Sequence, residues 1–282
     1  MITKKHGPEA RQQEIRNIRV SSAVGVEQGG RSYQEDHVEV LTFPSGETII
    51  SDLDGHSPGG NGFEATKQAA EVINTNLAHN LPRGVGIAEA LKFSFDQAHE
   101  SMVRSNPEAG ACAVVCYMGK EGVTTANLGD TEARLFTNKG IAHLTKALSM
   151  EEAEPAIRGM GGAVIQGRVV SVDRRQRGPN VPESLGNPYF PMLREPHITY
   201  KNWERGLNVV VTGSDGLWPY ITDGEIQAII GQERGDVSRI QQRVIKTANQ
   251  RAKNNAIGSA RIAGSKPTWD NISCGVGVAI KN

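Results

Sequence analysis

The chain has 282 residues, of which 38% are hydrophobic and 22% are charged, and its formal net charge is zero. A neutral chain offers no general electrostatic reason to bind nucleic acid or an anionic membrane, so neither is an expected partner. No apolar run approaches the roughly 20 residues that cross a bilayer, and the polar first 20 residues lack the apolar stretch of a secretory signal peptide, which predicts a cytoplasmic protein and leaves export without an N-terminal signal as the alternative.

The first half of the chain predicts an N-terminal arm at residues 1–20, then strands, two helices and more strands. Apolar alternation and short turns predict strands at 20–26, 38–43, 47–51, 111–118, 122–128, 133–137 and 141–144. Helical spacing of apolar residues predicts helices at 62–77 and 85–103. The close turns between the last four strands favour an antiparallel meander. Cys112, Cys116 and Cys274 match neither a disulfide framework nor a zinc pattern, and we interpret Cys112 and Cys116 as small core residues.

The second half predicts two capped helices separated by a long loop. Ser149 and Glu152 form a capping box for a short helix that ends near Gly159, and residues 163–170 indicate a hairpin. Residues 171–206 predict a flap-like insertion, because a loop of this length is either a functional surface loop or disordered. The remaining sequence predicts a strand at 207–211, a capping box at Thr222 and Glu225, a polar loop at 251–267 and a last strand at 271–280. Before the polar loop it predicts a long helix whose apolar stripe is Val237, Ile240, Val244, Ile245 and Ala248.

Strands and helices therefore occur in separate runs rather than in alternating βαβ units. This order predicts an α+β fold. No internal repeat or linker follows residue 20, so residues 21–282 are expected to form one domain.

Acidic residues stand at the ends of several predicted strands. Asp215 follows the apolar run 207–211 within Thr212-Gly213-Ser214-Asp215-Gly216-Leu217-Trp218, and Asp54, Asp270 and the pair Glu35-Asp36 occupy similar places. Carboxylate oxygens are the ligands that Mg²⁺ and Mn²⁺ prefer. Three or four carboxylates can hold two such ions about 3.5–4 Å apart, with a bridging water made nucleophilic by both.

Two further side chains fit a phosphate reaction. Arg31 could grip a phosphate through two parallel hydrogen bonds, and His56 could donate a proton to a leaving group. Each residue has a simpler interpretation when taken alone. An Asp-Gly pair is most often a turn, an exposed arginine is usually solvated, and a single histidine is more often structural than catalytic. The arrangement as a whole favours a metal site.

These residues resemble the motifs of the metal-dependent protein phosphatases (the PPM family, type 2C), in the order of that family from about residue 21 to the C-terminus. The matching elements are Arg31-Ser32-Tyr33-Gln34-Glu35-Asp36, Asp54-Gly55-His56 followed by Gly59-Gly60, Ala126-Asn127-Leu128-Gly129-Asp130-Thr131-Glu132-Ala133, Gly161-Gly162-Ala163-Val164, Ser184-Leu185-Gly186-Asn187, Glu195-Pro196-His197-Ile198, Ser214-Asp215-Gly216-Leu217-Trp218 and Asp270-Asn271-Ile272.

The resemblance implies a four-layer αββα sandwich, two antiparallel sheets stacked face to face with helices outside. It implies that Asp54 bridges two Mg²⁺ or Mn²⁺ ions, that Glu35 and the Gly55 carbonyl complete one site, and that Asp215 and Asp270 hold the other ion. In the same way it implies that Asp36 orients metal-bound water, that Arg31 binds the substrate phosphate, that His56 is the general acid, and that the bridging hydroxide attacks phosphorus in line.

Three departures from the family pattern affect these expectations. Pro219 stands where members carry an aspartate that helps to hold a third ion, so a weak third ion would depend on Asp130 alone. Ser57 and Pro58 are inserted directly after His56 and put its acid role in doubt. The flap-like insertion carries Asp173-Arg174-Arg175-Gln176-Arg177, which would either favour acidic or multiply phosphorylated substrates or form a solvated charged loop.

The sequence therefore predicts a phosphatase of phosphoserine and phosphothreonine, with phosphoproteins as substrates and a monomeric state. One alternative is a pseudophosphatase, in which the same fold serves only to bind a partner. The other is a different two-metal phosphoester hydrolase, for which a nucleic acid substrate is disfavoured by the neutral charge.

Overall fold

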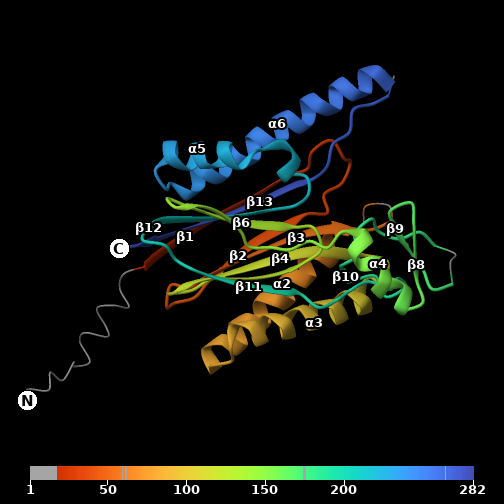
Figure 1. The fold of residues 1–282 in the computed structure, drawn as a ribbon, viewed down its shortest axis with the longest axis horizontal. Coiled ribbons are helices and arrows are strands. Elements are labelled where there is room, and N and C mark those ends of the chain that lie inside the picture. Colours follow the sequence, from red (N-terminus) through yellow and green to blue (C-terminus); the bar gives the residue numbers. More distant parts are fainter. Residues whose placement is uncertain (1–17, 59, 61, 174–175, 264) are drawn as a thin grey trace, which may run out of the picture.

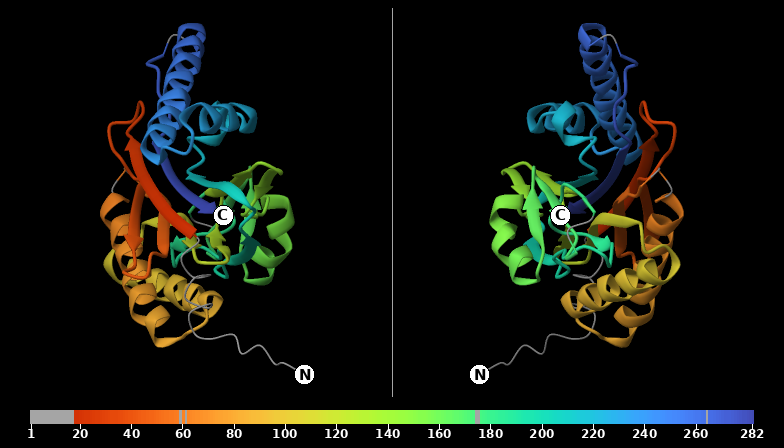
Figure 2. Two further views of the ribbon diagram at one scale, coloured as in Figure 1. Left: turned by 90° about the vertical axis from the view of Figure 1, so that its left-hand side faces the viewer. Right: turned by 90° about the vertical axis from the view of Figure 1, so that its right-hand side faces the viewer.

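The computed structural model describes residues 18–58, 60, 62–173, 176–263 and 265–282. Two antiparallel sheets are stacked face to face with helices on their outer sides (Figures 1 and 2). The first sheet has the order β1 (Ile18–Glu27), β13 (Ile272–Lys281), β12 (Gly206–Gly213), β6 (Glu132–Thr137) and β7 (Gly140–His143). The second has the order β11 (His197–Asn202), β5 (Gly122–Leu128), β4 (Gly110–Met118), β3 (Thr48–His56) and β2 (His37–Thr42), with β10 (Leu185–Gly186) also paired to β4. The predicted α+β class and αββα sandwich are confirmed.

A pair of helices covers each sheet. The helices α2 (Phe63–Asn80) and α3 (Ile87–Ser105) lie on the second sheet, and α5 (Asp223–Glu233) and α6 (Val237–Ala263) lie on the first (Figure 1). Both predicted capping boxes form, at the start of α5 and of the short helix α4 (Met150–Gly159). The α4 helix and the hairpin of β8 (Ala163–Ile165) and β9 (Arg168–Val170) lie together at one end of the sandwich (Figure 1). None of the helices in the described ranges is long and apolar enough to cross a membrane.

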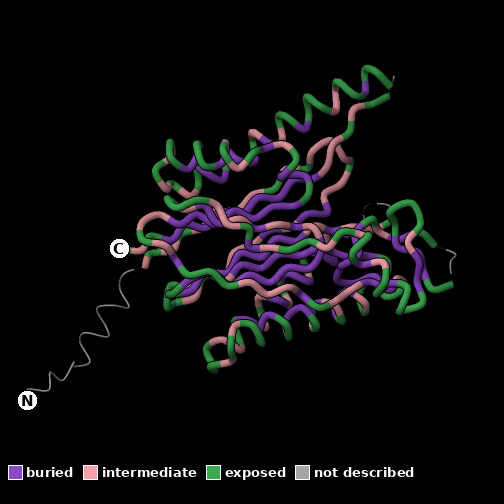
Figure 3. Tube along the Cα trace, in the orientation of Figure 1, coloured by how far each residue is buried: buried purple, intermediate pink, exposed green. Residues whose placement is uncertain are grey.

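The buried side chains form apolar layers between the sheets and under each helix pair, and Figure 3 shows these layers in purple along the strands. The layer between the sheets contains Ile50, Val114, Met118, Leu135 and Val210. All three cysteines are buried and free, which agrees with the interpretation of Cys112 and Cys116 as core residues. The rigid sandwich fixes the strand ends from which the candidate site residues extend.

Two sequence-based expectations are wrong. The polar loop predicted at 251–267 is helical up to Ala263, because α6 continues and buries Ala252 and Ala260, and alanine is the strongest helix former. The segment 171–206 is not one loop, since β10 and β11 lie within it and β11 pairs with β5 along its whole length. The sequence did not predict β11 because it is polar, as expected for an edge strand that keeps one side in water.

The boundary of the N-terminal arm also differs from the prediction. Strand β1 begins at Ile18 and not at residue 20, and residues 1–17 lie outside the described part of the chain. The predicted 47–51 strand continues to His56, so the Asp54-Gly55-His56 motif lies within β3. The motif is therefore held by the ladder of β3 with β4 rather than by a turn.

Asp52, on β3, is a buried carboxyl between the two sheets. It has no exposed surface, its Oδ2 accepts a hydrogen bond from the Thr212 hydroxyl at 2.7 Å, and its Oδ1 has no partner in the described structure. Burial raises the pKa of Asp52 from 3.8 to about 6. Folding therefore favours the protonated form of this side chain.

Asp52→Asn is expected to stabilise the protein at alkaline pH. A carboxyl with a raised pKa in the folded state contributes stability fully below pH 4, and that contribution is lost as pH rises through 6. The amide does not titrate, so the variant should gain about 2 kcal/mol in free energy of unfolding at pH 8 and little at pH 4. Urea unfolding at both pH values measures this gain, with Glu89→Gln on the exposed face of α3 as the control. An equal loss of stability at both pH values would contradict the assignment.

Candidate metal and phosphate site

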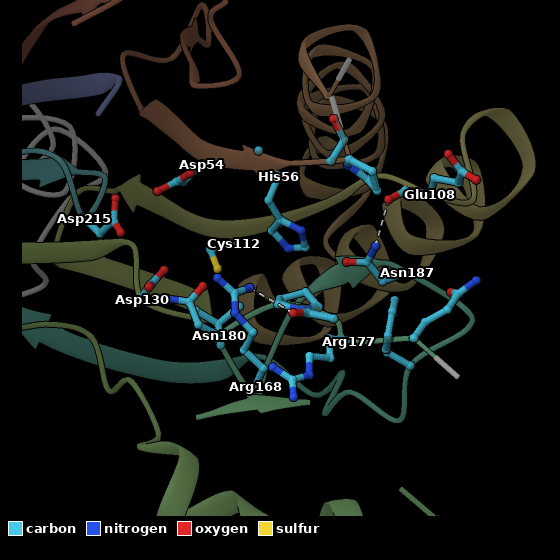
Figure 4. A pocket seen from close by; sticks show the side chains of 18 of the residues that line it. Asp54, His56, Glu108, Cys112, Asp130, Arg168, Arg177, Asn180, Asn187 and Asp215 are labelled. Atoms are coloured by element: carbon cyan, nitrogen blue, oxygen red, sulfur yellow. Dashed lines mark hydrogen bonds between the residues drawn. The ribbon is translucent and has the colours of Figure 1, made fainter. Parts of the chain in front are cut away.

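A cavity of about 800 Å³ opens at the end of the sandwich near the β8–β9 hairpin (Figure 4). The predicted site residues that line it are Arg31, Asp54, Gly55, His56, Asp130, Asp215 and Asp270. They come from the end of β3, the turns after β5 and β12, the segment after β1 and the segment before β13. The fold thus brings together side chains that are more than 200 positions apart in the sequence, such as Arg31 and Asp270.

The carboxylates in this cavity repel one another. Burial raises the pKa of Asp54 well above its ordinary value, and the negative charges of Asp36, Asp215, Asp130 and Asp270 raise it further. Partial desolvation, with Asp130 and Asp270 adding to it, raises the pKa of Asp215 to about 6, while a hydrogen bond with Asp54 opposes the shift. A bound cation would relieve this repulsion, because it neutralises like charges that are close together.

This chemistry fits a hard divalent cation. Asp54, Asp130 and Asp215 point into the same end of the cavity (Figure 4), and their oxygens are the donor type that Mg²⁺ and Mn²⁺ select. Within the described ranges, however, no three His, Cys, Asp or Glu side chains converge as ligands of one ion.

Two of the predicted ligands have other partners in this arrangement. Asp270 Oδ2 accepts from Arg31 Nη2 at 2.5 Å. Glu35 is buried outside the cavity lining, where its Oε1 accepts from the Ser57 hydroxyl at 2.6 Å and from the Gly62 amide at 2.8 Å. The inserted Ser57 thus bonds directly to a predicted ligand. Each carboxylate keeps further lone pairs with which it can bind an ion.

Asp36 lies beneath the carboxylate cluster rather than in the cavity wall. It is 2% exposed, and its Oδ2 has no hydrogen-bond partner in the part of the chain that is described. Burial raises the pKa of Asp36 well above its ordinary value, a hydrogen bond from Ser214 opposes the shift, and the nearby Asp52 and Asp215 add to it. A buried carboxyl oxygen without a protein partner is the kind of group that an ordered water satisfies.

Arg31 lies at the rim of the cavity. Besides its ion pair with Asp270, its guanidinium lies 5.7 Å from the centre of the Tyr33 ring. Only one of its nitrogens is bound to Asp270 in this arrangement. The remaining N–H groups of the fork can still bind a phosphate.

His56 is neutral and held in place. Desolvation, with the charge of Arg194 adding to it, lowers the pKa of His56 to about 4. Its Nε2 lies 3.0 Å from the Ser184 hydroxyl, and that hydroxyl donates to the Leu185 carbonyl at 2.6 Å. His56 is here a neutral side chain fixed by its neighbour.

Arg194 is the residue that the sequence reasoning missed. Its guanidinium donates to the carbonyls of Ser184 at 2.6 Å, of Asn187 at 3.0 Å and of Phe190 at 3.4 Å, and also to that of Gly186. Desolvation lowers its pKa to about 10, and no carboxylate among the described residues forms an ion pair with it. In the sequence it is one of several arginines of the 171–206 segment. The four carbonyls that define its role belong to the backbone and leave no sequence signal.

The segment that Arg194 holds forms a wall of the cavity. Gly186 and Asn187 both have positive φ, +68° and +46°, so the chain bends sharply there. A Cβ on Gly110 would lie 2.0 Å from Asn187 Oδ1 and 2.4 Å from His56 Cε1, so only glycine lets these two side chains approach β4. The glycine, the bend and Arg194 together set the position of the wall beside His56.

The other departures from the expected pattern also have structural counterparts. Pro219 lies in the short helix η2 (Trp218–Tyr220) and lines a second cavity of about 480 Å³, together with Arg134 and Arg251. It does not line the carboxylate cavity, whereas Asp130 does. Arg174 and Arg175 of the flap-like insertion lie outside the described residues, and Arg177 lines the carboxylate cavity.

Comparison with known proteins identifies relatives of this architecture. A family model described as "Protein phosphatase 2C" matches residues 54–257, which include Asp54, Asp130 and Asp215. Protein phosphatase 2C 16 of Arabidopsis thaliana is 28% identical over 147 residues, 50% of this chain and 27% of that protein. The match therefore spans only about a quarter of that relative.

Solved structures share the fold at low sequence identity. The serine-threonine phosphatase 2C of Toxoplasma gondii superposes with a TM-score of 0.70 at 15% identity, covering 92% of this chain and 94% of that one. The catalytic domain of the serine threonine protein phosphatase PstP, solved in complex with two manganese ions, superposes with a TM-score of 0.61 at 17% identity, covering 94% of this chain and all of that one.

Proposed function

Because this chain belongs to the protein phosphatase 2C family, we propose that it is a metal-dependent phosphatase that hydrolyses phosphoserine and phosphothreonine in proteins. One observation carries the proposal: Asp54, Asp130, Asp215 and Asp270 line the same cavity as Arg31. A cluster of carboxylates that repel one another attracts divalent cations, and an arginine beside it attracts a phosphate.

The site residues have distinct proposed roles in binding the ions and the phosphate. We propose that Asp54, Asp215 and Asp270 hold two Mg²⁺ or Mn²⁺ ions with help from Glu35 and the Gly55 carbonyl, and that Asp130 is the carboxylate available to a weak third ion. Bound cations of this kind neutralise the phosphate and acidify the attacking water. Arg31 orients the phosphate through the N–H groups not bound to Asp270.

Two further residues act around the reacting groups. Asp36 accepts a hydrogen bond from the attacking water through its unpartnered oxygen. The Nε2 atom of the neutral His56 is hydrogen-bonded to Ser184, so this nitrogen can pass a proton to the leaving oxygen only if that hydrogen bond exchanges. We further propose phosphoproteins as substrates, a monomeric state and a cytoplasmic location, with neither nucleic acid nor membrane as a partner.

Metal removal tests the proposal. The purified chain is expected to hydrolyse p-nitrophenyl phosphate and a phosphothreonine peptide in Mn²⁺, and to lose at least about a hundredfold of this activity in excess chelator, because the carboxylates alone do not activate water. Added Mn²⁺ should restore the rate. Undiminished turnover in chelator would exclude the metal-dependent reaction. Tight Mn²⁺ binding without hydrolysis of either substrate would instead identify a pseudophosphatase.

A further inference from the structure

Two arginines, Arg168 and Arg177, line the same cavity as the carboxylate cluster. Arg168 begins β9, and Arg177 lies on the segment that returns beside it. Backbone bonds from Val169 N to Pro179 O at 3.0 Å and from Gly178 N to Val169 O at 2.7 Å hold the two segments together. Both side chains are exposed and both line the carboxylate cavity, in which Figure 4 shows them below His56 and away from Asp54 and Asp215.

Neither arginine is neutralised by a carboxylate within the described ranges. Arg168 Nη1 donates to the Gly178 carbonyl at 3.1 Å, and Arg177 Nη1 donates to the Gln166 side chain at 2.8 Å. Each guanidinium carries five N–H groups, so both side chains keep donors beyond these two hydrogen bonds. Glu108, the cavity carboxylate outside the metal cluster, lies beside Asn187 and away from both arginines (Figure 4).

The isolated bridge between Val170 and Arg177 places Arg177 alongside β9, the strand that begins at Arg168. Long side chains on segments paired in this way can reach a common ligand. The two guanidinium groups can therefore act on a single oxyanion.

We propose that Arg168 and Arg177 form a second oxyanion subsite, which selects phosphopeptides with another negative charge close to the phosphoresidue that is cleaved. The inference rests on the proposed function and adds a substrate class to it. A phosphopeptide bound at Asp54 and Arg31 continues across a cavity that also has apolar walls, from Val181, Tyr189 and Phe190. The next acidic group of the bound peptide then pairs with Arg168 and Arg177.

A phosphate and a carboxylate share the chemistry that this subsite recognises. A second phosphate carries nearly two charges and three acceptor oxygens, which suit two guanidinium forks better than a single carboxylate does. We therefore expect the order of preference to be a second phosphoresidue, then glutamate, then a neutral residue.

Paired peptides test the subsite. One phosphothreonine peptide series carries alanine, glutamate or phosphoserine at each position from one to four residues on either side, and the readout is the ratio of kcat/KM between a charged peptide and its alanine partner. The wild-type ratio is expected to reach about tenfold at the best position for phosphoserine, as for a charge-assisted pair of about 1.4 kcal/mol. The gain should lie in KM and should fall as salt is raised from 50 to 500 mM.

Variants assign the preference to the two side chains. Arg177→Gln and the double variant Arg168→Gln/Arg177→Gln should lower the ratio stepwise towards one. Arg168→Glu/Arg177→Glu should invert it. Arg104→Gln removes the same charge from the exposed face of α3, outside the cavity, and should leave the ratio unchanged.

The outcomes separate this inference from the proposed function. If p-nitrophenyl phosphate is hydrolysed in Mn²⁺ but charged and neutral peptides have equal kcat/KM, the subsite is wrong and the phosphatase assignment stands. A wild-type preference that survives salt and both double variants also overturns the subsite. If no phosphoester is hydrolysed at all, the failure lies in the proposed function. Because the salt dependence uses the wild-type protein, the test does not depend on the folding of any variant.

Discussion

Asp54→Asn is expected to lower Mn²⁺-dependent phosphatase turnover by about a thousandfold, as for loss of a residue that the whole catalytic arrangement needs. Asp54 lies at the end of β3, and its position is fixed by pairing with Cys112 on β4. Asparagine has nearly the same shape and can still donate to Asp215, but it cannot supply a negative charge to a cation. The variant should therefore keep the fold and lose Mn²⁺ affinity, which calorimetry measures beside the turnover assay.

The same change is expected to stabilise the metal-free protein. Burial and neighbouring carboxylates raise the pKa of Asp54 well above its ordinary value, so metal-free stability is lost as pH rises through that raised pKa. The amide removes this dependence, and the melting temperature of Asp54→Asn in chelator should exceed that of the wild type by a margin that grows with pH. Glu89→Gln, the corresponding acid-to-amide change on the exposed face of α3, is the control. Wild-type turnover in Asp54→Asn would contradict the assignment of Asp54 as a metal ligand.

The sequence predicted those parts of the site that are carried by local patterns. Asp54, Asp130 and Asp215 each follow or end an apolar strand, and strands that pair in a sandwich bring such ends together. The capping boxes of α4 and α5 were readable for the same reason, since residues three positions apart make the bonds. Local order was enough to predict the α+β class, whereas the αββα layers were implied only by the family resemblance.

The parts that the sequence could not predict depend on distant partners. The polar strand β11 exists because β5 supplies its hydrogen bonds, and the second half of α6 is helical because Ala252 and Ala260 find buried positions. The side chain of Glu35 points to Ser57 and Gly62, a choice that the motif alone does not encode. Arg168 and Arg177 come together only through the pairing around β9.

Arg194→Met is expected to be the most destabilising single change in the wall of the cavity. The guanidinium binds four carbonyls of the 184–190 segment. Two of these carbonyls belong to Gly186 and Asn187, the residues with positive φ. Methionine fills much of the volume but donates no hydrogen bond, so these carbonyls lose a charged donor in a partly buried position. We expect a loss of about 3–4 kcal/mol in free energy of unfolding, measured by urea denaturation in chelator.

The effect of Arg194 should extend to the histidines and to catalysis. The charge of Arg194 adds to the desolvation that lowers the pKa of His56 and of His99, each to about 4, so its removal should raise both values, which NMR titration of the ring protons would follow. His99 Nδ1 also accepts from the Gly186 amide at 3.1 Å, so its signal reports on the same bend. Arg194→Lys keeps the charge but not the planar fork, and should therefore recover the low pKa values while regaining only part of the stability. If methionine and lysine behaved alike in both measurements, the four carbonyl bonds would not be what fixes the wall, and Arg194 would act through its charge-independent packing alone.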